Sequence, residues 1–131
     1  MVKQIIIVRK DLHMSYGKFG AQILHAGQSF FTDSEDFDND DEWYDEWLND
    51  GQPVIICSAR NKTNLMKAKT IAESLDLREG KDFWIIDDAC LTELKPEDWD
   101  EDGNGYTTTC IGFRPLKEEI ANKISKKFQL Y

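Results

Sequence analysis

Apolar runs alternate along this chain with stretches of helical spacing. Four short β-branched or aromatic runs, typical of strands buried on both faces, lie at 5–8, 54–57, 83–86 and 108–113. Helical patterns begin near Gly17, cover 62–75 and follow Pro115. The last of these places four apolar residues on one stripe, Leu116, Ile120, Ile124 and Phe128. This alternation predicts an α/β fold, a three-layer α/β/α sandwich with a small, mostly parallel four-stranded sheet.

The negative charge of the chain is concentrated in one segment. The formal net charge is −9, but residues 33–50 hold ten Asp and Glu and no Lys or Arg, which leaves 15 acidic and 16 basic residues elsewhere. Lys and Arg supply most of the affinity for nucleic acids, so the overall charge alone counts against such a partner. Because the excess is local, a polyanion can still approach another face.

Residues 33–50 are interpreted as an acidic insertion. Aromatic and apolar residues form a stripe within it, so a short amphipathic helix is predicted near 40–49. The insertion is either a solvated acidic helix packed by its aromatic residues or a surface that docks a protein or mimics a nucleic acid. The chain is expected to form a single domain, 1–131, with a second acidic stretch in the loop 93–106.

The apolar run at 5–8 is too short for a signal peptide or a membrane span. A cytoplasmic protein without membrane attachment is therefore expected. Three widely spaced cysteines, Cys57, Cys90 and Cys110, form no C-x-x-C pair that would indicate zinc or a redox centre. Two of them lie in apolar runs and are interpreted as small buried side chains.

The helix that begins near Gly17 carries a polar stripe. At 100° per residue, one side of it holds Lys18, Gln22, His25 and Ser29. A lysine in the first turn opposes the helix dipole. The stripe is either the solvated side of an amphipathic helix or part of a site, because ligands of open α/β sheets bind at the carboxyl ends of the strands. The strand predicted at 83–86 delivers Asp88 to that edge.

Several segments resemble one enzyme family, in order along the chain. The segment VRKDLHMSYGKFGAQILHA at 8–26 resembles the pattern V-R-x-D-L-x-M-x-x-G-K-x-A-A-Q-x-x-H-A of the archaeal and eukaryotic, or type 2, peptidyl-tRNA hydrolases. Weaker similarities follow in GQPVII (51–56), DDACLT (87–92), TCIGFRP (109–115) and the final FQLY. Where the family has a glycine after Asp-Ala, this chain has Cys90, at a turn that can require an unhindered backbone.

The resemblance implies an enzyme that hydrolyses the ester between a peptide and the 3′ ribose of tRNA and so recycles stalled peptidyl-tRNA. It implies peptidyl-tRNA as the partner, no cofactor and no metal, and it allows a homodimer. The catalytic positions that carry over are Lys18, His25 and Asp88. The expected substrate-binding positions are Gln22, Thr92, Thr109 and Arg9.

Ester hydrolysis gives these residue types a use. A water must lose a proton as it attacks, and the oxyanion must be stabilised as it forms. His25 or Asp88 is assigned to position the water, and Lys18 to stabilise the oxyanion or to hold a phosphate of the tRNA end. The alternative is a non-catalytic binding protein on the same fold, which uses the acidic insertion to engage a basic partner. Cys90 and the net charge of −9 favour that alternative.

A second acidic motif, residues 98–109, has the spacing of a calcium loop. Asp98, Asp100 and Asp102 occupy loop positions 1, 3 and 5, and Gly103 occupies position 6. Position 12 is Thr109, where such loops carry a bidentate glutamate. The segment is therefore either a weak calcium site or a flexible acidic hairpin turn.

Overall fold

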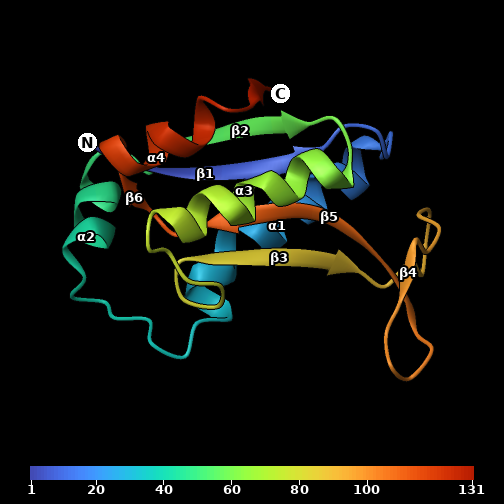
Figure 1. Cartoon of the computed structure of the whole chain (residues 1–131). Helices are drawn as coiled ribbons and strands as arrows, with labels where there is room; N and C mark the ends of the chain where they lie inside the picture. The colour runs from blue at the N-terminus through green and yellow to red at the C-terminus, as the bar shows by residue number, and fades with distance from the viewer.

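The apolar runs form the four longest strands of one sheet in the computed structural model, which describes residues 1–131 (Figure 1). The α/β class and the short helix in the acidic insertion are confirmed. In chain order the elements are β1 (Val2–Arg9), α1 (Tyr16–Thr32), α2 (Glu42–Asn49), β2 (Val54–Ala59), α3 (Lys62–Ser74), β3 (Phe83–Asp88), β4 (Asp98–Trp99), β5 (Gly105–Phe113), β6 (Leu116–Lys117), α4 (Glu118–Ser125) and β7 (Gln129–Leu130).

The sheet is mixed, which corrects the prediction of four mostly parallel strands. Seven strands form it, in the order β3-β5-β1-β2-β7, with β4 paired to β5 and β6 to β1. Of the neighbouring strands only β1 and β2 are parallel, whereas β5 is antiparallel to both β1 and β3. The chain between β3 and β5 contains no helix. A parallel neighbour would need a long crossover, so β5 returns antiparallel to β3.

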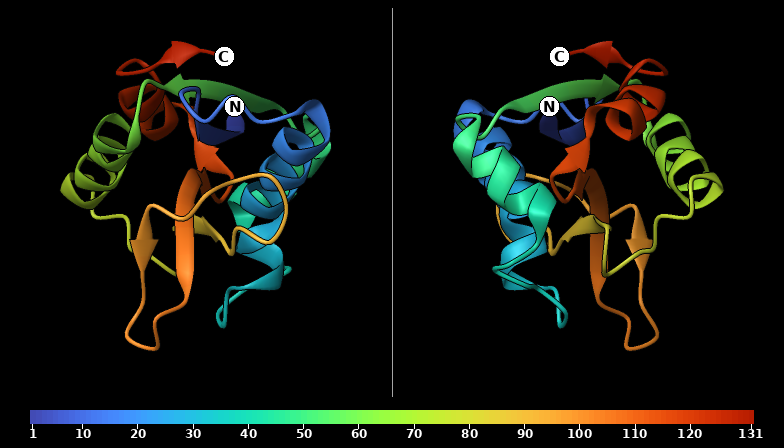
Figure 2. Two further views of the ribbon diagram at one scale, coloured as in Figure 1. Left: turned by 90° about the vertical axis from the view of Figure 1, so that its right-hand side faces the viewer. Right: turned by 90° about the vertical axis from the view of Figure 1, so that its left-hand side faces the viewer.

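Helices cover both faces of the sheet, as the three-layer prediction requires (Figure 2). Successive residues of β1 alternate between the faces. Ile5 and Ile7 pack into the core formed with α3 and α4, whereas Ile6 and Val8 pack against α1. On the side of the sheet that α1 covers, apolar packing extends to α2. There Trp47 belongs to a smaller apolar cluster.

Gly112 of β5 lets α1 lie close to the sheet. A Cβ atom at this position would lie 2.0 Å from the backbone oxygen of Ala26, which belongs to α1. Any side chain here would therefore push the helix away from β5. This close contact sets the distance between α1 and the sheet.

The last helix begins later than its apolar stripe predicts. Leu116 lies in β6, opposite Lys3 of β1, and α4 starts at Glu118. The pairing is available because β5 covers β1 only from Ile6 to Val8, which leaves the first residues of β1 without a neighbour on that side.

The strands β1, β2 and β3 all run in the same direction, so their carboxyl ends meet at one edge of the sheet (Figure 1). The acidic insertion lies at the other edge, where Trp47 of α2 packs against Val2 at the start of β1. No helix of the chain is both long enough and apolar enough to span a lipid bilayer.

Candidate active site

The carboxyl end of β3 and the first turn of α1 meet in an ion pair. Lys18 of α1 places its Nζ 2.7 Å from Oδ1 of Asp88, the last residue of β3. Only 14% and 11% of these side chains are exposed. The predicted meeting of basic and acidic groups at this edge is confirmed. A carboxylate from a distant strand thus offsets the unfavourable position of the lysine in the helix dipole.

Three donors hold the Asp88 carboxylate. Oδ1 accepts hydrogen bonds from Lys18 and, at 3.3 Å, from Gln22 Nε2, while Oδ2 accepts one from the backbone N–H of Cys90 at 2.9 Å. Gln22 is itself buried, and its Oε1 accepts a 2.5 Å hydrogen bond from Thr109 Oγ1. The carboxylate is therefore fixed from both α1 and β5.

Lys18 has a second partner, Thr92, whose Oγ1 accepts a hydrogen bond from Nζ at 3.3 Å. An ammonium has three donors and a carboxylate about four acceptor positions, so Lys18 and Asp88 each retain one free position. The site can accept one hydrogen bond from a water and donate one to an oxyanion. Five of the seven predicted site residues belong to this network: Lys18, Gln22, Asp88, Thr92 and Thr109.

A β-bulge directs Thr109 into the network. The register between β3 and β5 shifts between Ile86 and Asp87, and Thr109 is the extra residue on β5. Two successive side chains then face α1: Thr109 Oγ1 donates to Gln22 Oε1, and Cys110 Sγ lies 3.5 Å from the Gln22 backbone oxygen. Strict alternation would turn one of the two away from α1.

Cys90 takes the left-handed backbone conformation that favours glycine, with φ of 59°. This agrees with the glycine that the resemblance places here. The conformation costs a residue with a side chain about 1–2 kcal/mol. Its N–H nevertheless reaches Asp88 Oδ2, and its Sγ lies 3.4 Å from Thr107 Oγ1. Backbone strain is therefore retained at the residue that orients Asp88.

Ser15 and Glu93 tie the loop after β3 to the start of α1. Ser15 caps the helix by accepting the N–H of Lys18 at 3.3 Å, and it donates its hydroxyl and backbone N–H to Glu93 at 2.6 and 2.9 Å. These hydrogen bonds hold the pKa of Glu93 below its usual value. Neither residue is predicted from the sequence, although serine before a helix is a known capping signal.

His25 lies on the same side of α1 but outside the network. Its side chain is exposed, and its imidazole makes no hydrogen bond. It lies seven positions after Lys18, which is about 10 Å along the helix axis. A shared direction around the helix therefore does not bring the two side chains together. His25 instead lines a groove beside β3.

Arg9 is buried in an ion-pair network, with 3% of its side chain exposed. The guanidinium donates to both carboxylate oxygens of Asp11, to Glu97 and to the backbone oxygen of Thr108. The hydrogen bond to Glu97 outweighs burial and raises the pKa of Arg9 above its usual value. Arg9 thus joins β1, β5 and the loop that precedes β4, with no face open to substrate.

The residues of the calcium-like loop form a hairpin turn. Asp98 pairs with Tyr106 across β4 and β5 and forms an ion pair with Lys62. Asp100 Oδ1 accepts the N–H groups of Asp102 and Asn104, both at 2.9 Å. Nowhere in the chain do three or more Asp, Glu, His or Cys side chains gather in a way that could hold a metal ion.

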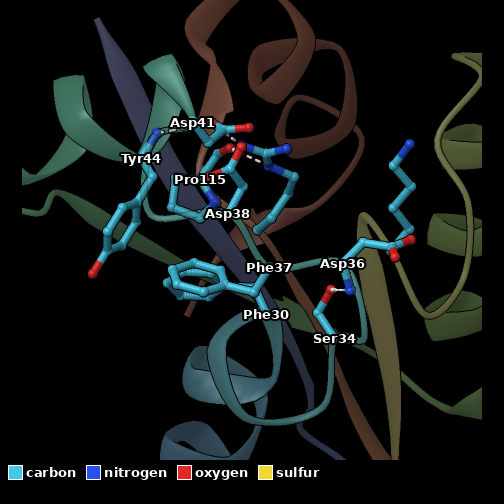
Figure 3. A pocket seen from close by; sticks show the side chains of 10 residues that line it. Phe30, Ser34, Asp36, Phe37, Asp38, Asp41, Tyr44 and Pro115 are labelled. Carbon is cyan, nitrogen blue, oxygen red and sulfur yellow. Dashed lines mark hydrogen bonds and ion pairs between the residues drawn. The ribbon is translucent and has the colours of Figure 1, made fainter.

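At the opposite edge of the sheet the acidic insertion forms ion pairs with the basic residues nearest to it. Asp41 pairs with Arg114, just after β5, and Glu46 with Lys117 at 3.3 Å. Burial tends to raise the pKa of Asp41, but hydrogen bonds from Arg114 and from the N–H groups of α2 lower it. A pocket of about 100 Å³ lies here, between Phe30 on one side and Asp41 on the other (Figure 3).

The chain as a whole matches a known enzyme family. The family model described as "Peptidyl-tRNA hydrolase PTH2" matches residues 2–131. The chain belongs to the peptidyl-tRNA hydrolase PTH2 family. Two archaeal proteins named peptidyl-tRNA hydrolase, from Saccharolobus islandicus (strain L.S.2.15 / Lassen #1) and Saccharolobus solfataricus, are each 33% identical over 132 residues, which is 99% of either chain. A relative of the same name from Methanopyrus kandleri is 33% identical over 125 residues, 95% of this chain and 94% of its own.

Membership in the PTH2 family confirms the family, the enzyme class and the reaction expected from the sequence. The reaction is hydrolysis of the ester that joins peptide and tRNA. The non-catalytic alternative is not favoured, because the match covers nearly the whole chain and includes both the α1 segment and the β3 end that form the network.

Proposed function

We propose that the network around Lys18 and Asp88 is the active site of this peptidyl-tRNA hydrolase. The observation that carries the proposal is the ion pair itself, which lies at the carboxyl edge of the sheet and leaves one donor and one acceptor free. Gln22 and Thr109 keep Asp88 in place, and Thr92 keeps Lys18 in place. The substrate ester lies against this ion pair, within reach of its free donor and its free acceptor.

In the proposed mechanism Asp88 positions the attacking water and accepts its proton. The water oxygen bonds to the ester carbonyl carbon, and Lys18 donates a hydrogen bond to the oxyanion that forms. The bond between this carbon and the 3′ ribose oxygen then breaks, and that oxygen takes up the proton that Asp88 accepted from the water. The products are a peptide with a free carboxyl group and tRNA with a free 3′ hydroxyl. Asp88 is preferred over His25 because it contacts Lys18 directly.

The remaining predicted positions take supporting roles. Arg9 holds Glu97 and thereby the loop that continues from Thr92, so we assign it to positioning rather than to substrate contact. His25 lines the groove next to the network and is assigned to a contact with the substrate.

The tRNA approaches the carboxyl edge of the sheet in this proposal. Lys10 follows β1 there and Arg60 follows β2, and both are exposed and outside the ion pairs of the fold. The acidic insertion lies at the other edge, and the Debye length of about 8 Å at physiological salt limits its repulsion of phosphates. A cytoplasmic location and a homodimer stay predictions. A basic partner for the insertion also stays one, although Arg114 and Lys117 already neutralise two of its acids.

The direct test is release of peptide from a labelled peptidyl-tRNA. Lys18→Ala should lower kcat by about 100- to 1,000-fold, the range seen when one donor to an oxyanion is removed. The matched control is Lys117→Ala, which removes a lysine paired at the opposite edge and should leave turnover unchanged. Circular dichroism should show both variants folded. Retained turnover in folded Lys18→Ala would reject the proposed site.

A further inference from the structure

We infer that the peptide of the substrate binds as an added strand along the free edge of β3, with its ester end at Lys18 and Asp88. The inference rests on the active site proposed above, since that site fixes where the ester lies. β3 is the last strand on its side of the sheet, so its outer edge has no strand beside it. Such an edge offers backbone N–H and C=O groups to an extended chain.

The open stretch of this edge can be located from the backbone. Gly80 donates its N–H to the Phe83 oxygen at 2.8 Å, so the backbone groups of Phe83 point away from β5. Since orientation alternates along a strand, Ile85 and Asp87 point their N–H and C=O groups to the same outer side. The chain at Glu79 bridges to Phe83 and covers that end. The edge is therefore open from there to Asp88.

A groove of about 430 Å³ runs between this edge and α1. Ile85 and Asp87 line it although their side chains are held elsewhere. Ile85 packs with the core under α3 and α4, and Asp87 accepts a 2.6 Å hydrogen bond from Thr108 Oγ1. These two residues therefore present their main chain to the groove. The opposite wall comes from α1 and its end: His25, Gln28, Ser29, Thr32 and Asp33.

The charge of the groove favours a peptide over the RNA end of the substrate. No Lys or Arg lines it, and Asp33 and Asp87 do, so phosphates would be repelled. Peptidyl-tRNAs carry peptides of differing sequence, and main-chain hydrogen bonds bind an extended peptide whatever its side chains. The groove also begins next to Asp88, where the ester lies in the proposed site.

The position of the ester sets the direction of the peptide. Its carboxyl end lies at Asp88 and its amino end points toward Asp33, so the peptide runs parallel to β3. In parallel pairing one peptide residue donates its N–H to the Ile85 oxygen and accepts the Asp87 N–H at its own C=O. Every second peptide residue therefore directs its main-chain N–H and C=O groups toward β3.

A comparison of peptide lengths tests the inference. The substrates are N-acetyl-alanyl-tRNA, which is too short to reach the edge, and N-acetyl-tetraalanyl-tRNA. For the wild type we expect kcat/KM about tenfold higher with the longer peptide, from two additional hydrogen bonds. Thr32→Trp, on the groove wall, should lower this ratio to about one. Thr70→Trp makes the same change at an exposed position of α3 and should keep the wild-type ratio.

A scan of N-methylated alanines along the tetrapeptide tests the main-chain contact. Removing an N–H should lower kcat/KM about three- to tenfold at every second residue and little at the others. Equal penalties at all positions would overturn strand pairing. Equal slowing of both substrates by Thr32→Trp would instead place the RNA end in the groove. If peptide length has no effect while Lys18→Ala still abolishes turnover, the active site stands and the inference about the peptide fails.

Discussion

Two helix starts, at opposite edges of the sheet, show how this fold separates structure from chemistry. At the start of α2 the residues present favour a helix. Asp41 caps two N–H groups at 2.9 and 3.1 Å, and the first turn carries Glu42 and Asp45. The start of α1 has a weaker cap and no acid in its first turn, where Lys18 lies instead. Its stabilising carboxylates come from Asp88 and from Glu93 in the loop after β3.

The difference supports the proposal that the start of α1 belongs to the active site. Where local preferences and tertiary contacts agree, as at α2, the acidic residues are explained by the helix that they cap. Where a local rule is broken and a distant element compensates, as at Lys18, the pattern is the one expected of a functional site. The strained backbone of Cys90 beside Asp88 follows the same logic.

The largest expected effect is a loss of stability at the edge of the sheet that carries the acidic insertion. Trp47 is buried against Val2 and Phe30, and its Nε1 donates to the Pro53 oxygen at 3.0 Å. Trp47→Ala should lower the free energy of unfolding by about 3–5 kcal/mol, measured by urea denaturation. The exposed Trp99 is the control, because Trp99→Ala should change it by less than about 0.5 kcal/mol. A loss of turnover in folded Trp47→Ala protein would show that the acidic insertion belongs to the active site.

A smaller effect is expected inside the network. Thr109→Val keeps the volume but removes the hydroxyl that holds Gln22, so Asp88 loses its fixed position. We expect kcat to fall about tenfold, because small displacements of reacting groups are costly. Thr109→Ser retains the hydroxyl and should recover most of the rate. Equal rates in the valine and serine variants would show that this hydrogen bond does not position the site.

The smallest expected effect concerns the strained turn. Cys90→Gly should raise the free energy of unfolding by about 1 kcal/mol, because glycine adopts positive φ without steric cost. Cys90→Ala keeps the strained conformation and should show no such gain. Thermal denaturation of the two variants under identical conditions measures the difference. A glycine variant less stable than the alanine one would mean that the turn is unstrained.

The sequence predicts the elements and most of the network, for identifiable reasons. The strands that end at Arg9 and Asp88 are apolar runs, and the similarity of residues 8–26 and 87–92 to the family supplies Lys18, Gln22 and Asp88. The order of strands is not predictable from these runs, since β-branched residues suit parallel and antiparallel strands alike. The absence of a helical pattern between β3 and β5 is the signal that predicts their antiparallel pairing.

Other features depend on tertiary contacts that no local pattern encodes. The bulge that turns Thr109 toward Gln22 arises from pairing between strands distant in sequence. The burial of Arg9 depends on Glu97, which lies 88 residues away. The separation of His25 from Lys18 could not be inferred from their placement on one side of α1. Direction around a helix does not give the distance along its axis.

The central claim is that Lys18 and Asp88 act as one catalytic unit, and a double-mutant cycle tests it most directly. Lys18→Met, Asp88→Asn and the double variant are compared with the wild type in single-turnover cleavage of peptidyl-tRNA, after circular dichroism has shown that all are folded. We predict that each single variant loses about 100-fold or more and that the double variant loses no more than the slower single one. Losses that multiply in the double variant, or turnover retained in either single variant, would contradict the claim.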